Sequence, residues 1–90
     1  MAVVYKYELK KANAYNSTKF VFERNAYSMA GADYGWYNPD TKYEGEAWFS
    51  TDSKPVLSEV AVHRLARSVD GKVAISKYID DKLVSYREVK

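Results

Sequence analysis

The chain of 90 residues contains no cysteine, and this absence excludes two kinds of chemistry. No disulfide can cross-link the fold, and no thiolate can act as a nucleophile or as a metal ligand. Stability must then come from packing alone, which a hydrophobic content of 47% makes feasible. The length corresponds to one compact domain, residues 1–90, with a modest core.

Long apolar runs are also missing, and none approaches the roughly 20 residues that cross a bilayer. The first ten residues alternate in polarity and carry Lys6, Glu8 and Lys10, so they cannot form the apolar core of a signal peptide. We therefore expect a cytoplasmic protein that makes no contact with a membrane.

Neither sign of charge dominates, because 14 basic and 12 acidic residues leave a net charge of +2. The two signs are interspersed, and no block of one sign forms a tail. This balance does not by itself indicate nucleic-acid binding. Tyrosine, in contrast, is abundant: the nine residues suit half-buried sheets as well as binding surfaces.

Alternating polarity predicts two strands near the start of the chain, residues 3–10 and 18–24, joined in a hairpin. The second strand is expected to point Phe20 and Phe22 inward. Residues 25–41 follow as a long loop or short helix. The first strand is expected to turn four side chains to one side: Val3, Tyr5, Tyr7 and Leu9.

A third strand is predicted over residues 42–50, with Glu44, Glu46 and Trp48 on its outer side. The strongest pattern comes next. Capping residues at 51–53, a proline in the first turn and a glycine after Asp70 predict an amphipathic helix of roughly four turns. Its apolar side comprises Leu57, Val60, Ala61, Leu65 and Val69.

Residues 72–79 and 82–89 predict a second hairpin around Asp80-Asp81, which pairs Ile75 with Tyr86 and Lys77 with Val84. The core face of this hairpin is expected to comprise Val73, Ile75, Ile79, Val84 and Tyr86. The predicted order is β-β-(loop or short helix)-β-α-β-β. It corresponds to an α+β fold in which one amphipathic helix packs on a mostly antiparallel sheet of about five strands.

No set of residues in the sequence points to catalysis or metal binding. The only histidine, His63, has Glu59 four residues before it, which gives two potential ligands where three or four are needed. An exposed pair on a helix explains both residues, and a solvated strand face explains Glu44 and Glu46. The sequence therefore predicts no catalytic residue, metal or cofactor, and a protein that is not an enzyme.

Aromatic residues cluster within the predicted loop, beside a glycine and a proline. Tyrosine and tryptophan are enriched at protein-binding hot spots because they bury large areas at low entropic cost. The simpler explanation is that some of these rings seal a small core. The candidate partner-binding residues are Tyr27, Tyr34, Trp36 and Tyr37, with Trp48 on the third strand.

Lysines interleaved with aromatic residues allow an alternative, a nucleic-acid-binding module. Rings on a sheet can stack bases while lysines neutralise phosphates, although a packed core and a solvated face would produce the same pattern. Two arginines on the predicted helix, together with Lys72, add a small basic ridge. The candidate residues are Lys6, Lys10, Lys11, Lys19, Arg64 and Arg67.

The chain matches no family motif. In its size and its lack of a catalytic set it is similar to small phage-encoded proteins that inhibit host machinery, such as anti-CRISPR proteins. This analogy implies an inhibitor that binds a larger host complex for defence or nucleic-acid processing. The leading hypothesis is thus a non-enzymatic protein-binding module, and an exposed sheet edge also allows homo-oligomers.

Overall fold

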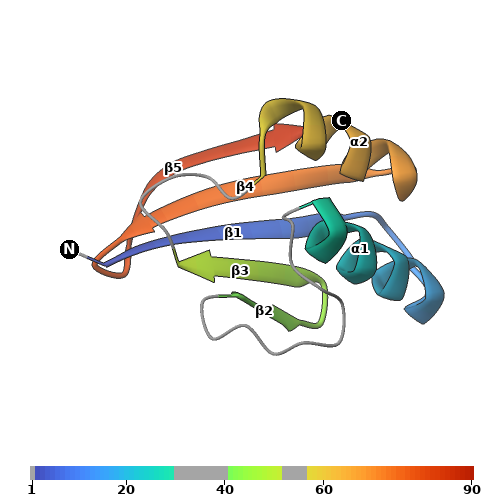
Figure 1. Cartoon of the computed structure of the whole chain (residues 1–90), viewed down its shortest axis with the longest axis horizontal. Coiled ribbons are helices and arrows are strands. Elements are labelled where there is room, and N and C mark those ends of the chain that lie inside the picture. Colours follow the sequence, from blue (N-terminus) through green and yellow to red (C-terminus); the bar gives the residue numbers. More distant parts are fainter. Residues whose placement is uncertain (1, 30–40, 52–56) are drawn as a thin grey trace.

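The computed structural model describes residues 2–29, 41–51 and 57–90, which form a five-stranded antiparallel sheet and two helices. The predicted α+β class and antiparallel sheet are confirmed, but the prediction of one helix is wrong. The elements in chain order are β1 (Val3–Lys10), α1 (Asn16–Met29), β2 (Thr41–Glu44), β3 (Ala47–Thr51), α2 (Glu59–Ser68), β4 (Lys72–Ile79) and β5 (Lys82–Val89) (Figure 1).

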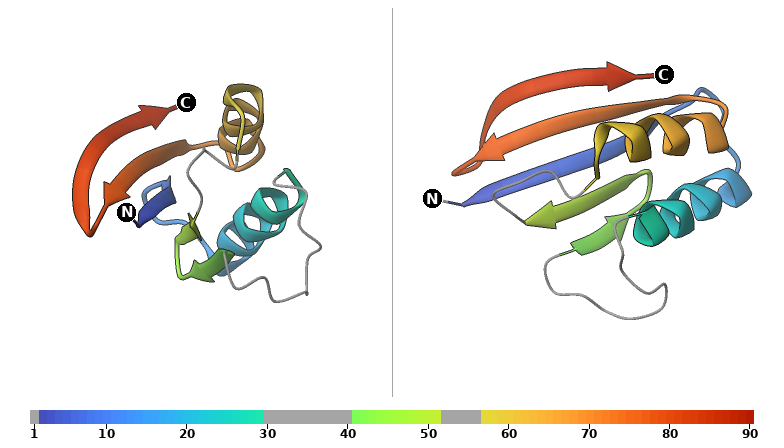
Figure 2. Two further views of the ribbon diagram at one scale, coloured as in Figure 1. Left: turned by 60° about the vertical axis from the view of Figure 1, so that its left-hand side comes forward. Right: turned by 45° about the horizontal axis from the view of Figure 1, so that its top comes forward.

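The strands lie in the order β2-β3-β1-β4-β5, so the first strand of the sequence is the central strand of the sheet. β1 to β4 and the two helices follow the order of a split β-α-β (ferredoxin-like) arrangement, and β5 extends one edge. Both helices pack on the same face of the sheet (Figure 2). No described helix covers the other face.

The core lies between the helices and this sheet face. The side of β1 that was predicted to be apolar supplies Tyr5, Tyr7 and Leu9, each at most 5% exposed. β3 and β4 place their own side chains beside them, because residues opposite each other in an antiparallel pair share a face. The helices contribute five buried side chains: Phe22, Ala26, Val62, Leu65 and Ala66.

Residues 18–24, which were predicted as a strand, belong to α1, so the predicted first hairpin is wrong. Phe22 and Ala26 lie one helical turn apart and are both fully buried, whereas Phe20 is 47% exposed. This period of 3.6 residues is visible only over the whole of α1, while the segment TKFVFER alone alternates like a strand.

The predicted strand over residues 42–50 is two strands, β2 and β3, joined at Gly45 and Glu46. Gly45 has a φ of 61°, which a type II′ hairpin turn requires at its first central position and which glycine adopts without strain. Trp48 pairs with Tyr7 of β1 on the helix side. The prediction that Trp48 lies on the outer side is therefore wrong.

α2 begins at Glu59 rather than near residue 55, and its N-cap is Ser58. The Ser58 side chain accepts a hydrogen bond of 3.2 Å from the backbone N–H of Ala61. Of the predicted apolar side, Leu57, Leu65 and Val69 are buried and Ala61 is partly buried. Val60 is 60% exposed, and Val62 and Ala66 are buried instead.

The C-terminus of α2 closes in a Schellman motif, in which Gly71 donates its N–H to the carbonyl of Ala66 and Asp70 donates to Arg67. Glycine usually occupies the left-handed position of this motif. Here Asp70 takes it, with a φ of 49°, and Gly71 follows. Gly71 lies against Lys11, since a Cβ at position 71 would come within 3.3 Å of the Lys11 Cβ.

β4 and β5 form the second predicted hairpin with the predicted bounds. Asp80 and Asp81 have φ angles of 48° and 67°, as a type I′ turn requires. Near this turn the register is as predicted. It then shifts by one residue, because Val84 is an extra residue in β5 and Lys77 pairs with Ser85.

The bulge at Val84 exchanges the two faces of β5 beyond it, because a shift of one residue turns every side chain over. Tyr86, predicted in the core, pairs with Ser76 on the face away from the helices and is 51% exposed. Val89 faces the helices and is 4% exposed. The prediction that Val84 and Tyr86 belong to the core is therefore wrong.

Candidate functional site

The aromatic residues predicted to bind a partner are only partly described. Trp48 has no exposed area, and its ring packs against Tyr7 at 5.5 Å and edge-on against Tyr27 at 5.7 Å. Trp48 is thus a core residue rather than a surface contact, and the half-buried Tyr27 supports it. Tyr34, Trp36 and Tyr37 lie outside the described residues, so their role stays a prediction.

Among the strand residues whose exposure the structure describes, those of β5 present the most exposed apolar surface. This strand lies at the edge of the sheet, and residues 82–88 are exposed along both of its faces. We call Leu83, Val84 and Tyr86, which are between 51% and 55% exposed, the β5 patch. The patch could not be predicted from the sequence, because the alternating polarity of β5 assigns two of its three members, Val84 and Tyr86, to the core.

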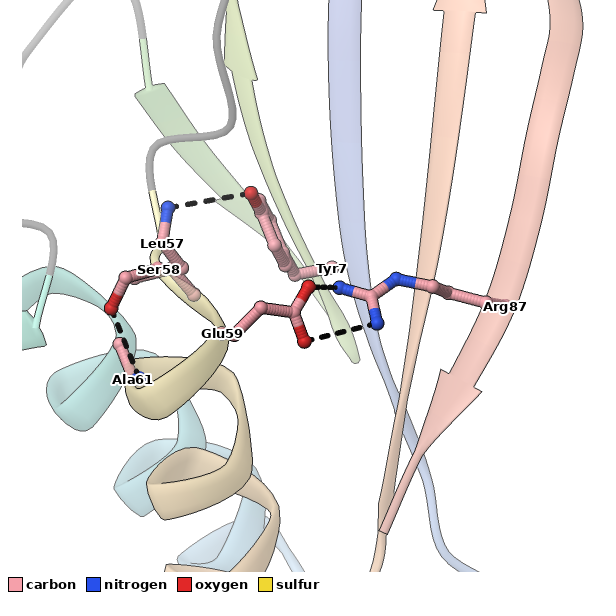
Figure 3. A network of polar contacts seen from close by, with 6 residues as sticks. All are labelled: Tyr7, Leu57, Ser58, Glu59, Ala61 and Arg87. Carbon is pink, nitrogen blue, oxygen red and sulfur yellow. Dashed lines mark hydrogen bonds and ion pairs between the residues drawn. The ribbon is translucent and has the colours of Figure 1, made fainter.

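A groove of about 350 Å³ lies between β5 and the start of α2. Figure 3 shows four of the residues that line it: Tyr7, Leu57, Glu59 and Arg87. Tyr7 and Leu57 line its inner end, where the N–H of Leu57 donates to the Tyr7 hydroxyl at 3.4 Å. Arg87 of β5 reaches across to α2 and donates from both terminal nitrogens to the carboxylate of Glu59, one of them at 3.1 Å. This pair ties the edge strand to the helix layer.

A second and larger hollow, of about 610 Å³, lies at the opposite end of α2. Its lining comes from the ends of β1, α2 and β5 and from the start of β4. Two carboxylates, Asp70 and Glu88, are the acidic groups of this lining. We call the hollow the basic cleft, after its basic residues Lys10, Lys11, His63, Arg67, Lys72 and Lys90.

Three of the six cations predicted to bind nucleic acid, Lys10, Lys11 and Arg67, meet in the basic cleft. The other three do not. Lys6 lies on the face away from the helices, 3.8 Å from Glu8 and 5.8 Å from the centre of the Phe49 ring. Lys19 of α1 pairs with Glu46 at 3.0 Å, and Arg64 is an exposed residue of α2 that does not line the cleft.

Sequence reasoning grouped Lys72 with Arg64 and Arg67 in a basic ridge, but it did not place Lys10 and Lys11 beside Lys72. It also did not count His63 or Lys90 among the binding residues. Lys10 and Lys72 are paired residues of β1 and β4, so the sheet register places them together. Lys90 follows β5, whose register depends on the bulge. No local pattern in the sequence carries this information, because it is the tertiary fold that brings the four segments together.

Two cations of the cleft, Lys10 and Lys11, have polar partners within the fold. Lys10 lies 3.3 Å from Glu8, and this hydrogen bond raises the pKa of Lys10 above its ordinary value. Lys11 donates to the carbonyl of Val69 at 2.9 Å and so compensates the negative end of the α2 dipole. Arg67, Lys72 and Lys90 make no salt bridge with any described residue.

Within residues 2–29, 41–51 and 57–90, no three acidic or histidine side chains gather in a way that could hold a metal ion. Glu59, the possible companion of His63, is engaged by Arg87 instead. No helix in the same residues combines the length and apolar character of a membrane span. Comparison with known protein families, characterised proteins and solved structures finds no match, so function must be inferred from the chain itself.

Proposed function

We propose that the chain is a non-enzymatic protein-binding module that docks its partner on the β5 patch. The observation that carries this proposal is the exposure of an eight-residue edge strand along both faces, with three large apolar side chains more than half in solvent. A long apolar edge is a template for pairing with another chain. A segment of the partner that adds as a sixth strand would bond to the backbone of β5 and cover Leu83 and Tyr86.

The partner in this proposal is a larger protein or complex rather than a second copy of the chain. Two β5 strands pairing with each other would have to accommodate two bulges at Val84, and a bulge is a device that discourages such pairing. The five residues after the bulge, 85–89, form a regular segment that can accept one partner strand. The likeness in size to phage-encoded inhibitors supports an inhibitory role.

The predicted loop aromatics Tyr34, Trp36 and Tyr37 remain candidates for a second contact. Trp48 no longer belongs to this set, because it lies in the core. Trp36→Ala/Tyr37→Ala variants should weaken binding while the far-UV circular dichroism and the urea midpoint stay unchanged. Loss of folding would instead assign both rings to the core.

Affinity capture from a lysate of the native host, treated with nuclease and washed at high salt, tests the docking surface. The variant Leu83→Lys/Tyr86→Lys places two charges in the β5 patch. The matched control is Val60→Lys/Tyr15→Lys, which charges an equally exposed aliphatic residue and a tyrosine elsewhere. We expect one discrete protein to be retained by the wild type and the control and lost by the β5 variant. Equal retention by both variants, or no protein partner at all, would overturn the proposal.

A further inference from the structure

The basic cleft concentrates the positive charge of the chain. Five lysines and arginines against two carboxylates give its lining a formal charge of +3 with His63 neutral, whereas the whole chain carries +2. Everything outside the cleft is therefore slightly acidic in sum. The two signs of charge are evenly mixed along the sequence, yet the fold gives the lining of one hollow a larger net positive charge than the whole chain has.

Compensation of the helix dipole does not account for this charge. The C-terminus of a helix is equivalent to about half a negative charge. Lys11 already meets it by bonding to the carbonyl of Val69, and the Schellman motif satisfies the carbonyls of Ala66 and Arg67. The remaining cations repel one another without a benefit inside the fold. An anionic ligand would remove that repulsion.

The cations available to such a ligand are Arg67, Lys72 and Lys90, which have no ionic partner among the described residues. They come from α2, β4 and the residue after β5, and they border one hollow. Because the sheet register fixes Lys72 beside Lys10, the spacing of these charges is built into the fold.

The lining also indicates which anion fits. Lysine is a common ligand of phosphate, which it contacts as a point charge, and the one arginine adds a planar fork that also fits phosphate oxygens. The lining contains no side-chain amide to read base edges, and the groups that can stack on an unpaired base, His63 and Arg67, do so with little preference for its identity. A volume of about 610 Å³ exceeds what one phosphate group needs, and a single strand leaves its bases unpaired and able to stack.

We propose that the basic cleft binds consecutive backbone phosphates of single-stranded nucleic acid without recognising the bases. This site is separate from the β5 patch, so the proposal for the cleft does not depend on whether a protein partner binds that patch. A net charge of +3 corresponds to about three neutralised phosphates, and log Kobs should then fall against log salt with a slope of about −2.

Fluorescence anisotropy with labelled oligo-dT and oligo-dA, measured over a series of NaCl concentrations, tests this proposal on the full chain. The cleft variant is Arg67→Glu/Lys72→Glu. The matched control, Arg24→Glu/Lys82→Glu, changes the net charge equally at exposed residues that do not line the cleft. Circular dichroism melts of each variant verify folding, and the single variant Lys90→Gln provides a milder probe at the chain end.

We expect similar affinity for the two oligonucleotides, at least a tenfold loss in the cleft variant with a shallower salt slope, and less than a threefold loss in the control. Lys90→Gln should weaken binding without changing the melt. Equal losses in the cleft variant and the control would assign binding to overall charge and overturn the proposal. Failure of the wild type to bind, or complete displacement of the oligonucleotide by millimolar orthophosphate, would also overturn it.

Discussion

Deleting Val84 removes the bulge of β5 while leaving the later residues on their present faces. After this deletion Ser85 pairs with Lys77 and Tyr86 with Ser76, as they do now, and the ladder to β4 becomes regular. Deleting both Val84 and Ser85 has the opposite effect. Every residue from Tyr86 onward then moves by one position and turns to the other face.

The cost of the double deletion can be worked from the residues that exchange places. Val89, now 4% exposed, would leave the core, which costs about 1.5 kcal/mol or more. Glu88 would take the exposed position of Arg87 opposite Ile75, so the ion pair between Arg87 and Glu59 would be lost and two carboxylates would face each other, which costs roughly 0.5 kcal/mol more. We expect a loss of about 2 kcal/mol, whereas deletion of Val84 alone should stay within about 1 kcal/mol.

Urea denaturation measures both values when it is followed by far-UV circular dichroism and by tryptophan fluorescence, for which the buried Trp48 is a suitable probe. The comparison requires similar m-values, because the change in free energy is otherwise confounded by a change in compactness. The reasoning is refuted if the single deletion destabilises the protein as much as the double deletion, since the bulge would then be required for the packing of β5.

Two smaller perturbations test other local features. Asp70→Gly should raise the free energy of unfolding by up to about 1 kcal/mol in urea titrations, because Asp70 has a φ of 49° that glycine adopts without strain. A decrease in this free energy would show that the Asp70 carboxylate stabilises the turn. Glu23→Gln should stabilise the fold at neutral pH, because burial raises the pKa of Glu23. The folded state then binds its proton more readily than the unfolded state, so this residue lowers stability as the pH rises through the carboxyl range. The gain of the variant should disappear below that range, and a gain that does not depend on pH would contradict this cause.

The sequence predicted those elements whose local pattern agrees with their tertiary environment. β1 alternates because one of its faces packs on the helices, and α2 carries an apolar side with a Ser cap and a Gly after its end. The hairpin of β4 and β5 has the predicted bounds because Asp80 and Asp81 both tolerate the left-handed conformation. In these cases the period and the turn chemistry point to the same structure.

The errors arose where a short pattern fits two structures. TKFVFER alternates over seven residues, yet Phe22 and Ala26 show that a helical period governs it. The turn at Gly45 divides residues 42–50, which were predicted as one strand, into two. The bulge at Val84 shifts the register between β4 and β5 away from the one that a two-residue turn predicts. The bulge leaves no trace in the alternation of β5. The meeting of Lys10 with Lys72 and Lys90 leaves none either, because it depends on the pairing of strands that are distant in the sequence.

The position of β1 at the centre of the sheet also has a consequence for the order of folding. β1 is made first during synthesis, but its partners are β3 and, near the other end of the chain, β4. Tyr5, Tyr7 and Leu9 therefore lack their neighbours in β4 until residue 77 has emerged. Contacts between such distant segments slow folding because a long loop must close first. A nascent chain that stalls before β4 would expose an apolar central strand with one edge open, and it would depend on chaperones to avoid aggregation.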